Sequence, residues 1–181
     1  MLFHPKIRLG CPGRWGDPLE PRSNAPIAFL DRDGVINVDK GYVHSISEFE
    51  FTQDGVAAIE WLKEQGALVA VVTNQSGIGR DYYTEKEFIE LSVWLLDQAP
   101  IDLILYCPHS PDENCPARKP GISMLEAAQY LLGDNVQHSF LIGDKPSDIA
   151  AAEAFGIKGY PFEGGSLLEA VQLAAKNSGT F

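Results

Sequence analysis

The feature that most constrains the fold is a regular alternation of short apolar runs with amphipathic segments after residue 26. The apolar runs are predicted strands, at 27–30, 67–73, 101–106, 139–144 and 157–162. The amphipathic segments are predicted helices, at 54–66, 84–98, 122–132, 146–155 and 166–176. Parallel strands need crossover connections, so this order predicts a parallel sheet covered on both faces by helices. We therefore expect an α/β protein with a doubly wound, Rossmann-like sheet.

Local signals support the boundaries of these elements. Asp54 is a candidate N-cap for the first helix, and Thr84 with Glu87 forms a capping-box pattern at the start of the second. Pro146 suits the first turn of a helix, and Gly156 suits the position just beyond its end.

The domain organisation is predicted to be simple. Residues 1–25 are rich in proline, glycine and arginine and show no periodicity, so we expect an irregular N-terminal arm. Residues 26–181 then form one domain. Only about twenty residues lie between the end of the first strand and the first helix, which leaves no room for a separate cap domain.

Composition excludes some classes of function. The net charge of −11 argues against a surface that binds nucleic acid or an anionic membrane. No apolar run reaches the ~18 residues of a membrane span. Pro5, Lys6 and Arg8 interrupt the N-terminus before the apolar region of a signal peptide could form. We therefore expect a cytoplasmic monomer that acts on a small molecule, without nucleic-acid or membrane partners.

Polar side chains follow four of the predicted strands where each strand ends. They are Asp31 and Asp33 after the first strand, Thr73 and Asn74 at the end of the second, Arg118 and Lys119 beyond the third, and Asp144 and Lys145 after the fourth. In open parallel sheets, ligands bind beyond the carboxyl ends of the strands, where the strand order reverses. We expect these side chains to converge on one site.

Their chemistry suits phosphoryl transfer. Three neighbouring carboxylates repel one another unless a cation lies among them, and oxygen ligands favour a hard ion such as Mg²⁺. Lysine cations and a threonine hydroxyl suit an anionic phosphoryl group. Asp31 comes first after the strand and is assigned as the nucleophile; Asp33, two residues on, is assigned as the acid/base.

These motifs resemble those of the haloacid dehalogenase (HAD) superfamily of aspartate-nucleophile phosphatases. "DRDGV" is similar to its first motif, "VVTNQ" to its second, Lys119 to its third and "GDKPSD" to its fourth. The stretches "FLDRDGVINVDKGYVH", "VVTNQSGIGR", "YCPH" and "CPARKP" resemble the branch of D-glycero-D-manno-heptose-1,7-bisphosphate 7-phosphatases. "TNQ", "CPH" and "RKP" also occur in histidinol-phosphate phosphatases, whereas "DKGYVH" favours the heptose branch.

The resemblance implies a set of roles. Mg²⁺ would be held by Asp31, Asp144 and the backbone carbonyl of Asp33. Thr73, Lys119 and Asn74 would hold the transferring phosphoryl group, and Arg118 the far end of a sugar bisphosphate. Lys145 would stabilise the negative charge of the nucleophile. The sugar would be bound by Asp39, Lys40, Gly41, Tyr42, Gln75 and Ser76. The product would serve the synthesis of a nucleotide-activated heptose, as in the lipopolysaccharide route.

A second metal site is suggested by Cys107, His109 and Cys115, which resemble a structural zinc loop of the form CxH…CxC. Structural zinc is normally four-coordinate, but the fourth position of the motif is Ala117. Three alternatives are open: another group completes the site, with Cys11 as a candidate; water completes it; or no zinc binds and the loop packs through its prolines. We predict that zinc binds.

The sequence leaves two alternative functions to consider. Histidinol phosphate or another small phosphomonoester is the alternative substrate. A binding or scaffold protein on an inactive phosphatase fold is the alternative class, but all the expected catalytic residues are present.

Overall fold

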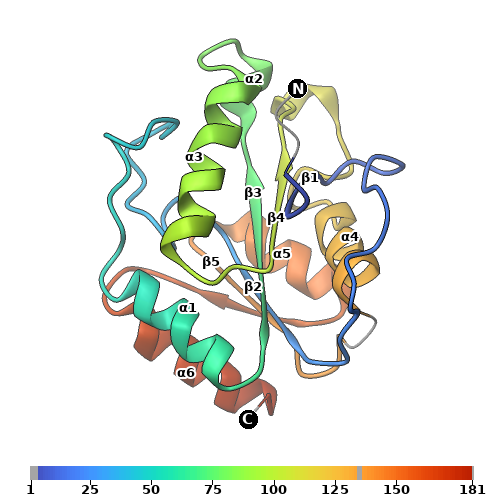
Figure 1. The fold of residues 1–181 in the computed structure, drawn as a ribbon, viewed down its shortest axis with the longest axis vertical. Helices are drawn as coiled ribbons and strands as arrows, with labels where there is room; N and C mark the ends of the chain where they lie inside the picture. Colours follow the sequence, from blue (N-terminus) through green and yellow to red (C-terminus); the bar gives the residue numbers. More distant parts are fainter. Residues whose placement is uncertain (1–3, 134–135, 181) are drawn as a thin grey trace.

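One parallel sheet forms the centre of the molecule (Figure 1). The computed structural model describes residues 4–133 and 136–180. Within them the sheet has six strands in the order β1-β4-β3-β2-β5-β6, and every neighbouring pair is parallel. The strands are β1 (Ile7–Leu9), β2 (Ile27–Leu30), β3 (Leu68–Asn74), β4 (Leu103–Cys107), β5 (Phe140–Gly143) and β6 (Lys158–Pro161). The predicted α/β class is confirmed.

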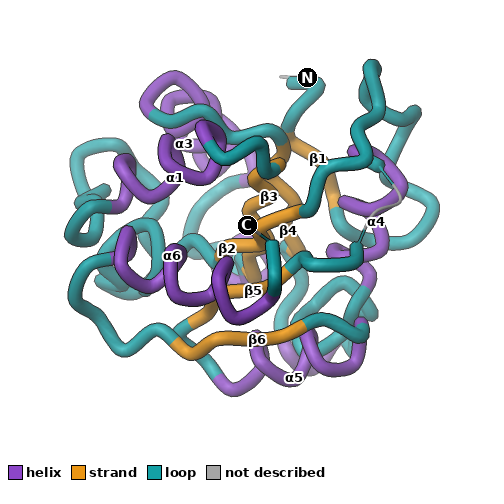
Figure 2. The backbone as a smooth tube through the Cα atoms, turned by 90° about the horizontal axis from the view of Figure 1, so that it is seen from below, coloured by secondary structure: helices purple, strands orange, loops and turns teal. Residues whose placement is uncertain are grey.

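Helices cover both faces of this sheet, as the view in Figure 2 shows. One face carries α1 (Gly55–Glu64), α3 (Glu85–Gln98) and α6 (Leu167–Ser178), and the other carries α4 (Ser123–Leu132) and α5 (Pro146–Phe155). Two shorter elements are α2 (Ser76–Gly79) and the 3₁₀ turn η1 (Pro111–Glu113). Each face buries its own apolar cluster, which explains why the central strands β2, β4 and β5 are buried along their whole length. No separate cap domain is evident in the described residues.

The strand order reverses at β2. The chain passes from β2 to β3 and β4 on one side, and then returns to β5 on the other side of β2. All four residues of β2 are buried, so this strand is fixed in the middle of the sheet. A crevice therefore opens beyond the carboxyl ends of β2 and β5, where ligands bind in folds of this kind.

The N-terminal arm differs from the prediction in one respect. Residues Ile7–Leu9 form β1, which pairs with β4 at the edge of the sheet. A three-residue strand gives no periodicity to detect, and its partner lies almost a hundred residues away. The backbone N–H of Gly10 also donates to the carbonyl of Tyr106 at 2.9 Å, which continues the arm along β4.

The predicted helix signals are mostly confirmed. Thr84 and Glu87 form a reciprocal capping box, Pro146 lies in the first turn of α5, and Gly156 ends that helix in a left-handed conformation with φ 91°. Asp54 stands at the N-cap position of α1 but makes no capping hydrogen bond with its side chain; it accepts instead from the hydroxyl of Ser166 at 2.6 Å. That contact joins α1 to α6.

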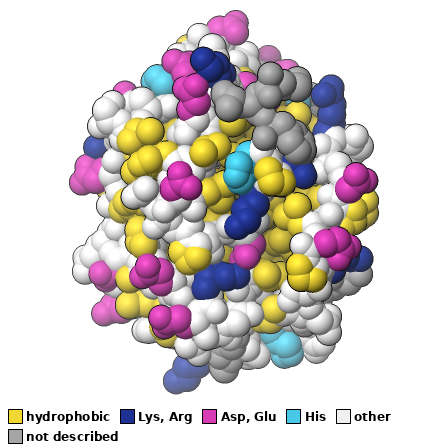
Figure 3. Space-filling model, in the orientation of Figure 1, with side chains coloured by type: hydrophobic (Ala, Val, Ile, Leu, Met, Phe, Trp, Pro, Cys, Tyr) yellow, Lys and Arg dark blue, Asp and Glu magenta, His cyan; other side chains and the backbone are white. Residues whose placement is uncertain are grey.

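The surface on the face drawn in Figure 3 mixes acidic, basic and hydrophobic side chains. No extended basic patch is visible on this face. Among the described residues, no helix combines the length and apolarity that crossing a bilayer requires.

Candidate active site

Lys119 lies at the centre of the candidate site. Its Nζ is 2.9 Å from Oδ1 of Asp31 and 2.7 Å from Oδ1 of Asp148, and it also donates to the carbonyl of Val72 at 2.7 Å. The lysine side chain is 1% exposed. An ammonium group has three donors, and each has a partner here. Burial alone would lower the pKa of Lys119, but the two aspartates raise it, so the lysine stays charged.

Asp31 follows β2 directly and is buried. Burial raises its pKa to about 7; Lys119 opposes this shift, while Asp148 and Asp33 add to it. Oδ1 of Asp31 accepts from both Lys119 and the backbone N–H of Arg32, at 2.8 Å for the latter. These two donors fix the orientation of the carboxylate at the crevice.

Three carboxylates could hold a metal ion. Oxygen atoms of Asp31, Asp144 and Asp148 lie within 4.8 Å of one another. Oδ1 of Asp144 is buried and has no hydrogen-bond partner among the described residues. Burial raises the pKa of Asp144, and Lys145 opposes this. One unpaired carboxylate oxygen beside two other acidic groups fits a hard cation such as Mg²⁺.

Gly34 brings the backbone against this acidic group. Its φ is +87°, and a Cβ atom there would lie 2.4 Å from Oδ2 of Asp144. Any larger residue would displace the carboxylate, so only glycine allows the loop after Asp33 to pass so close.

Asp33 lies beside the same crevice. Its carboxylate accepts hydrogen bonds from Arg32, from Nδ2 of Asn37 at 3.1 Å and from Nε2 of Gln75 at 3.0 Å. Gln75 also donates to Oγ1 of Thr73 at 2.7 Å and accepts from the hydroxyl of Tyr83 at 2.5 Å. The side chains that follow β2 and β3 are therefore joined by one hydrogen-bond network.

Asn74 fixes the loop that carries Lys119. Its side chain accepts from the backbone N–H of Lys119 at 3.0 Å and donates to the carbonyl of the same residue at 3.2 Å. This two-way pairing attaches the loop after β4 to the end of β3. Arg118 donates to the carbonyl of His109 at 3.2 Å and faces the same crevice.

These side chains surround a cavity of about 370 Å³. Most of the residues predicted from the sequence line it, and they come from four strand ends. They are Asp31, Asp33, Asp39, Gly41, Tyr42, Thr73, Asn74, Gln75, Ser76, Arg118, Lys119 and Lys145. Lys145 reaches Asp39 at 3.2 Å and Asp144 at 3.5 Å, so it bridges the substrate side of the cavity and the acidic cluster.

Lys40 does not line this cavity. Its Nζ pairs with Glu50 at 2.8 Å and donates to the carbonyl of Glu48 at 3.2 Å. Its neighbours Asp39, Gly41 and Tyr42 line the cavity, and Gly41 adopts a left-handed conformation with φ +75°. A contact of Lys40 with the sugar therefore remains a prediction.

Roles were not assigned from the sequence to Tyr83, Ser147 and Asp148, which line the cavity, or to Arg32, which contacts Asp33. Asp148 pairs with Lys119 and also accepts from the backbone N–H of Lys145 at 3.0 Å. Its position within "GDKPSD", at the third residue of a helix that follows a buried strand, was the available signal. Tyr83 and Arg32 gave no comparable signal, because their roles depend on contacts across the fold.

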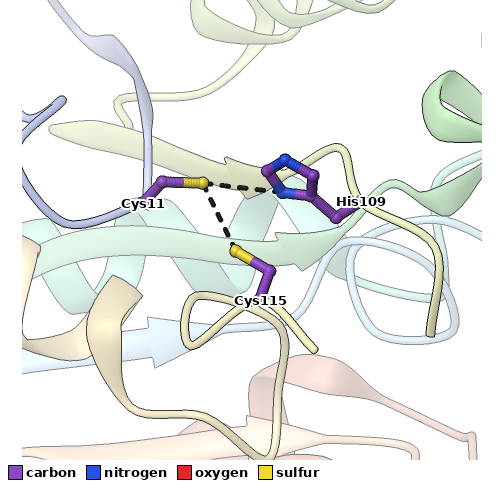
Figure 4. Close-up of side chains that lie close together, drawn as sticks. All are labelled: Cys11, His109 and Cys115. Carbon is purple, nitrogen blue, oxygen red and sulfur yellow. Dashed lines mark hydrogen bonds between the residues drawn. The ribbon is translucent and has the colours of Figure 1, made fainter. Parts of the chain in front are cut away.

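The cysteine cluster differs from the predicted trio. Sγ of Cys11 lies 3.5 Å from Sγ of Cys115 and 3.6 Å from Nδ1 of His109 (Figure 4). These three residues form a compact group whose ligand atoms all lie within 4.8 Å of one another. Cys107 is outside that group, although its Sγ is 3.6 Å from Nδ1 of His109. Burial raises the pKa of Cys11 to about 11 and that of Cys107 to about 12.

Comparison with known proteins decides the family. A profile of the HAD-hydrolase-like family matches residues 116–177. The D-glycero-beta-D-manno-heptose-1,7-bisphosphate 7-phosphatase of Yersinia pestis is 43% identical over 146 residues, which cover 74% of this chain and 78% of that protein. The corresponding alpha-anomer enzyme of Photorhabdus laumondii is 39% identical over 143 residues, with 72% and 78% covered. The chain belongs to the heptose-bisphosphate phosphatase family of HAD-like hydrolases.

Solved structures agree with this family assignment. The D,D-heptose 1,7-bisphosphate phosphatase of B. bronchiseptica, complexed with magnesium and phosphate, is 26% identical and has a TM-score of 0.71. The match covers 84% of this chain and 99% of that one. As a member of the heptose-bisphosphate phosphatase family, the chain is a phosphatase.

The raised pKa of Asp31 predicts how stability depends on pH. Its pKa is about 7 in the folded chain and near its ordinary value of 3.8 when unfolded. Between these values the folded state binds the extra proton, so the free energy of unfolding falls as pH rises from about 4 to 7. Without divalent metal, chemical denaturation of Asp31→Asn should show a shallower fall over this range than the wild type.

Asp39→Asn is the matched control, because the pKa of Asp39 shifts in the opposite direction. Burial alone would raise this pKa, but the hydrogen bond from the backbone N–H of Gly41 and the charge of Lys145 lower it below its ordinary value. Its contribution to stability is lost as pH falls, so this variant should leave the fall toward pH 7 intact. Equal pH slopes in wild type and Asp31→Asn would contradict the assignment.

Proposed function

We propose that this protein is a Mg²⁺-dependent phosphatase that removes the 7-phosphate of D-glycero-D-manno-heptose 1,7-bisphosphate through an aspartyl phosphate on Asp31. The main support is the meeting of Asp31, Asp33, Thr73 and Lys119 around one cavity at the strand reversal. The names of the relatives at 39–44% identity support the substrate.

In the first half of the reaction, the carboxylate of Asp31 attacks phosphorus and the bond from phosphorus to the sugar oxygen breaks. Asp33 gives its proton to that leaving oxygen. Lys119 and the hydroxyl of Thr73 hold the phosphoryl oxygens while their charge shifts. Mg²⁺, held by Asp31, Asp144 and the carbonyl of Asp33, with Asp148 nearby, would neutralise negative charge around the phosphoryl group.

In the second half, Asp33 takes a proton from water, and the water oxygen attacks the phosphorus of the acyl phosphate. Inorganic phosphate leaves and the Asp31 carboxylate is restored. Asp33 is thereby protonated and ready for the next substrate.

Recognition of the substrate involves both ends of the cavity. A guanidinium suits a second phosphate because it donates two parallel hydrogen bonds, and Arg118 is the candidate. Asp39, Gly41, Tyr42, Gln75 and Ser76 are available to the sugar hydroxyls. A cytoplasmic, monomeric enzyme acting without nucleic-acid or membrane partners remains our prediction.

Phosphate release tests the proposed function. The assay measures phosphate release from both anomers of heptose 1,7-bisphosphate, from heptose 7-phosphate and from histidinol phosphate. Each compound is measured with and without Mg²⁺. The predicted result is a kcat/KM for one heptose bisphosphate at least ~100-fold above that for histidinol phosphate, since losing a bidentate Arg–phosphate contact costs several kcal/mol when it is desolvated. Activity should require Mg²⁺.

Asp31→Asn should abolish turnover while leaving the circular dichroism spectrum unchanged. Asp97→Asn, an exposed change on α3 away from the cavity, is the matched control and should retain full activity. Preference for histidinol phosphate would overturn the substrate, and unaltered turnover of Asp31→Asn would overturn the covalent mechanism.

We also propose a structural zinc ion held by Cys11, Cys107, His109 and Cys115. Four N and S ligands suit tetrahedral zinc. Cys11 would replace the ligand that the motif lacks at Ala117, which is buried in the same apolar cluster as Cys107. β1 and the Gly10–Tyr106 hydrogen bond hold Cys11 beside this loop. The ion would therefore join the N-terminal arm to the loop that carries Arg118 and Lys119.

Elemental analysis tests the zinc proposal. Protein purified without chelator should contain about one zinc per chain, and Cys11→Ser should bind zinc at least ~10-fold more weakly, because structural sites need all four ligands. His109→Ala should lose zinc, whereas His138→Ala, a histidine whose Nδ1 contacts the carbonyl of Ser178, should keep it. Absence of zinc from the wild type, or an unchanged affinity in Cys11→Ser, would contradict the site.

A further inference from the structure

Arg32, between the two aspartates, is not used in the proposed mechanism. Its side chain is 1% exposed. An arginine is rarely so deeply buried unless it is paired. The contacts of its guanidinium indicate what it does.

The guanidinium pairs with both oxygens of the Asp33 carboxylate. Nη2 donates to Oδ1 at 2.9 Å, and Nε donates to Oδ2 at 3.2 Å. Asn37 and Gln75 each donate to one oxygen only. Arg32 is therefore the contact that fixes the plane of the carboxylate as well as its position.

The same nitrogen also contacts the loop of residues 39–43, called the substrate loop below. Nη2 donates to the carbonyl of Val43 at 2.6 Å, and Val43 directly follows Tyr42, which lines the cavity. The guanidinium carbon lies 5.7 Å from the centre of the Phe88 ring on α3. Arg32 is thus held between Asp33, the substrate loop and α3.

One nitrogen of the guanidinium, with its two N–H donors, remains unpaired. Nη1 is buried and has no hydrogen-bond partner among the described residues. A buried donor without a partner destabilises the fold, and a buried ion pair is often no more stable than apolar side chains of similar volume. Stability alone therefore does not account for an arginine here.

We propose that Arg32 is a positioning residue: it orients the Asp33 carboxylate for proton transfer and couples that orientation to the substrate loop through the Val43 carbonyl. This inference rests on the proposed function, in which Asp33 protonates the leaving oxygen. An acid/base must lie within hydrogen-bond reach of that oxygen, and small misplacements reduce the rate strongly. Arg32 acts through Asp33 and does not touch the reacting phosphoryl group.

Two substrates whose leaving groups differ in basicity can show whether Arg32 orients Asp33 or only stabilises the fold. A sugar alkoxide needs a proton to leave, whereas p-nitrophenolate leaves without one. In single-turnover measurements at saturating enzyme, Arg32→Met should cleave the heptose 7-phosphate ester ~100-fold more slowly, the usual scale of general acid catalysis. The burst of p-nitrophenolate from p-nitrophenyl phosphate should slow less than ~5-fold, because that step needs no acid.

A second variant and a double mutant complete the test. Arg32→Lys keeps a buried cation but loses the two-point contact. It should therefore also slow cleavage of the sugar ester more than that of p-nitrophenyl phosphate, but by a smaller factor. This variant replaces Arg32→Met in the comparison if Arg32→Met does not fold. In an Asp33→Asn background, either Arg32 change should have no further effect on the sugar ester. Leu91→Ala, a buried change on α3, should lower the melting temperature without altering the ratio of the two rates.

The outcomes are distinct. Equal losses of cleavage rate on both esters, or a further loss in the Asp33→Asn background, would overturn the positioning role. The proposed phosphatase function would still stand. A wild type that cleaves neither ester would overturn the proposed function and this inference with it.

Discussion

The buried contact of Lys119 with Asp31 and Asp148 is the interaction on which the site depends. Three strand ends meet there: Asp31 follows β2, Asp148 lies in the helix after β5, and Lys119 comes from the loop after β4. Two carboxylates in such a dry place would be strongly disfavoured as ions without a buried cation. The lysine therefore opposes the rise in the pKa of Asp31 that burial and Asp148 cause, and it joins separate loops at one catalytic rim.

The fold supplies the geometry that this contact needs. Strand order reverses at β2, so Asp31 and Asp144 emerge on either side of one crevice. Asn74 attaches the Lys119 loop to β3, and β1 brings Cys11 to the same loop from the N-terminal arm. Without a separate cap domain in the described chain, specificity depends on short loops, chiefly the one that carries Asp39 and Tyr42.

Much of this could be predicted from the sequence, for identifiable reasons. Strand-end residues such as Asp31, Thr73 and Asp144 follow apolar runs directly, so topology alone brings them together. Contacts between side chains far apart in sequence could not be predicted in the same way. The pairing of Asp148 with Lys119 and the contact of Arg32 with Asp33 depend on packing, whereas Cys11 could be named as a candidate fourth ligand because the motif lacks one at Ala117. The pairing of Lys40 with Glu50, outside the cavity, likewise depends on the local path of its loop.

The central claim is that the Asp31 carboxylate becomes esterified to phosphorus. Rapid quenching of turnover with borohydride tests it most directly, since an aspartyl phosphate is reduced to homoserine while a free carboxylate is not. Peptide mass spectrometry should find homoserine at position 31, and only when substrate is present. Position 33 should remain aspartate. Continued turnover with no reduction at position 31, or homoserine at another aspartate, would contradict the account.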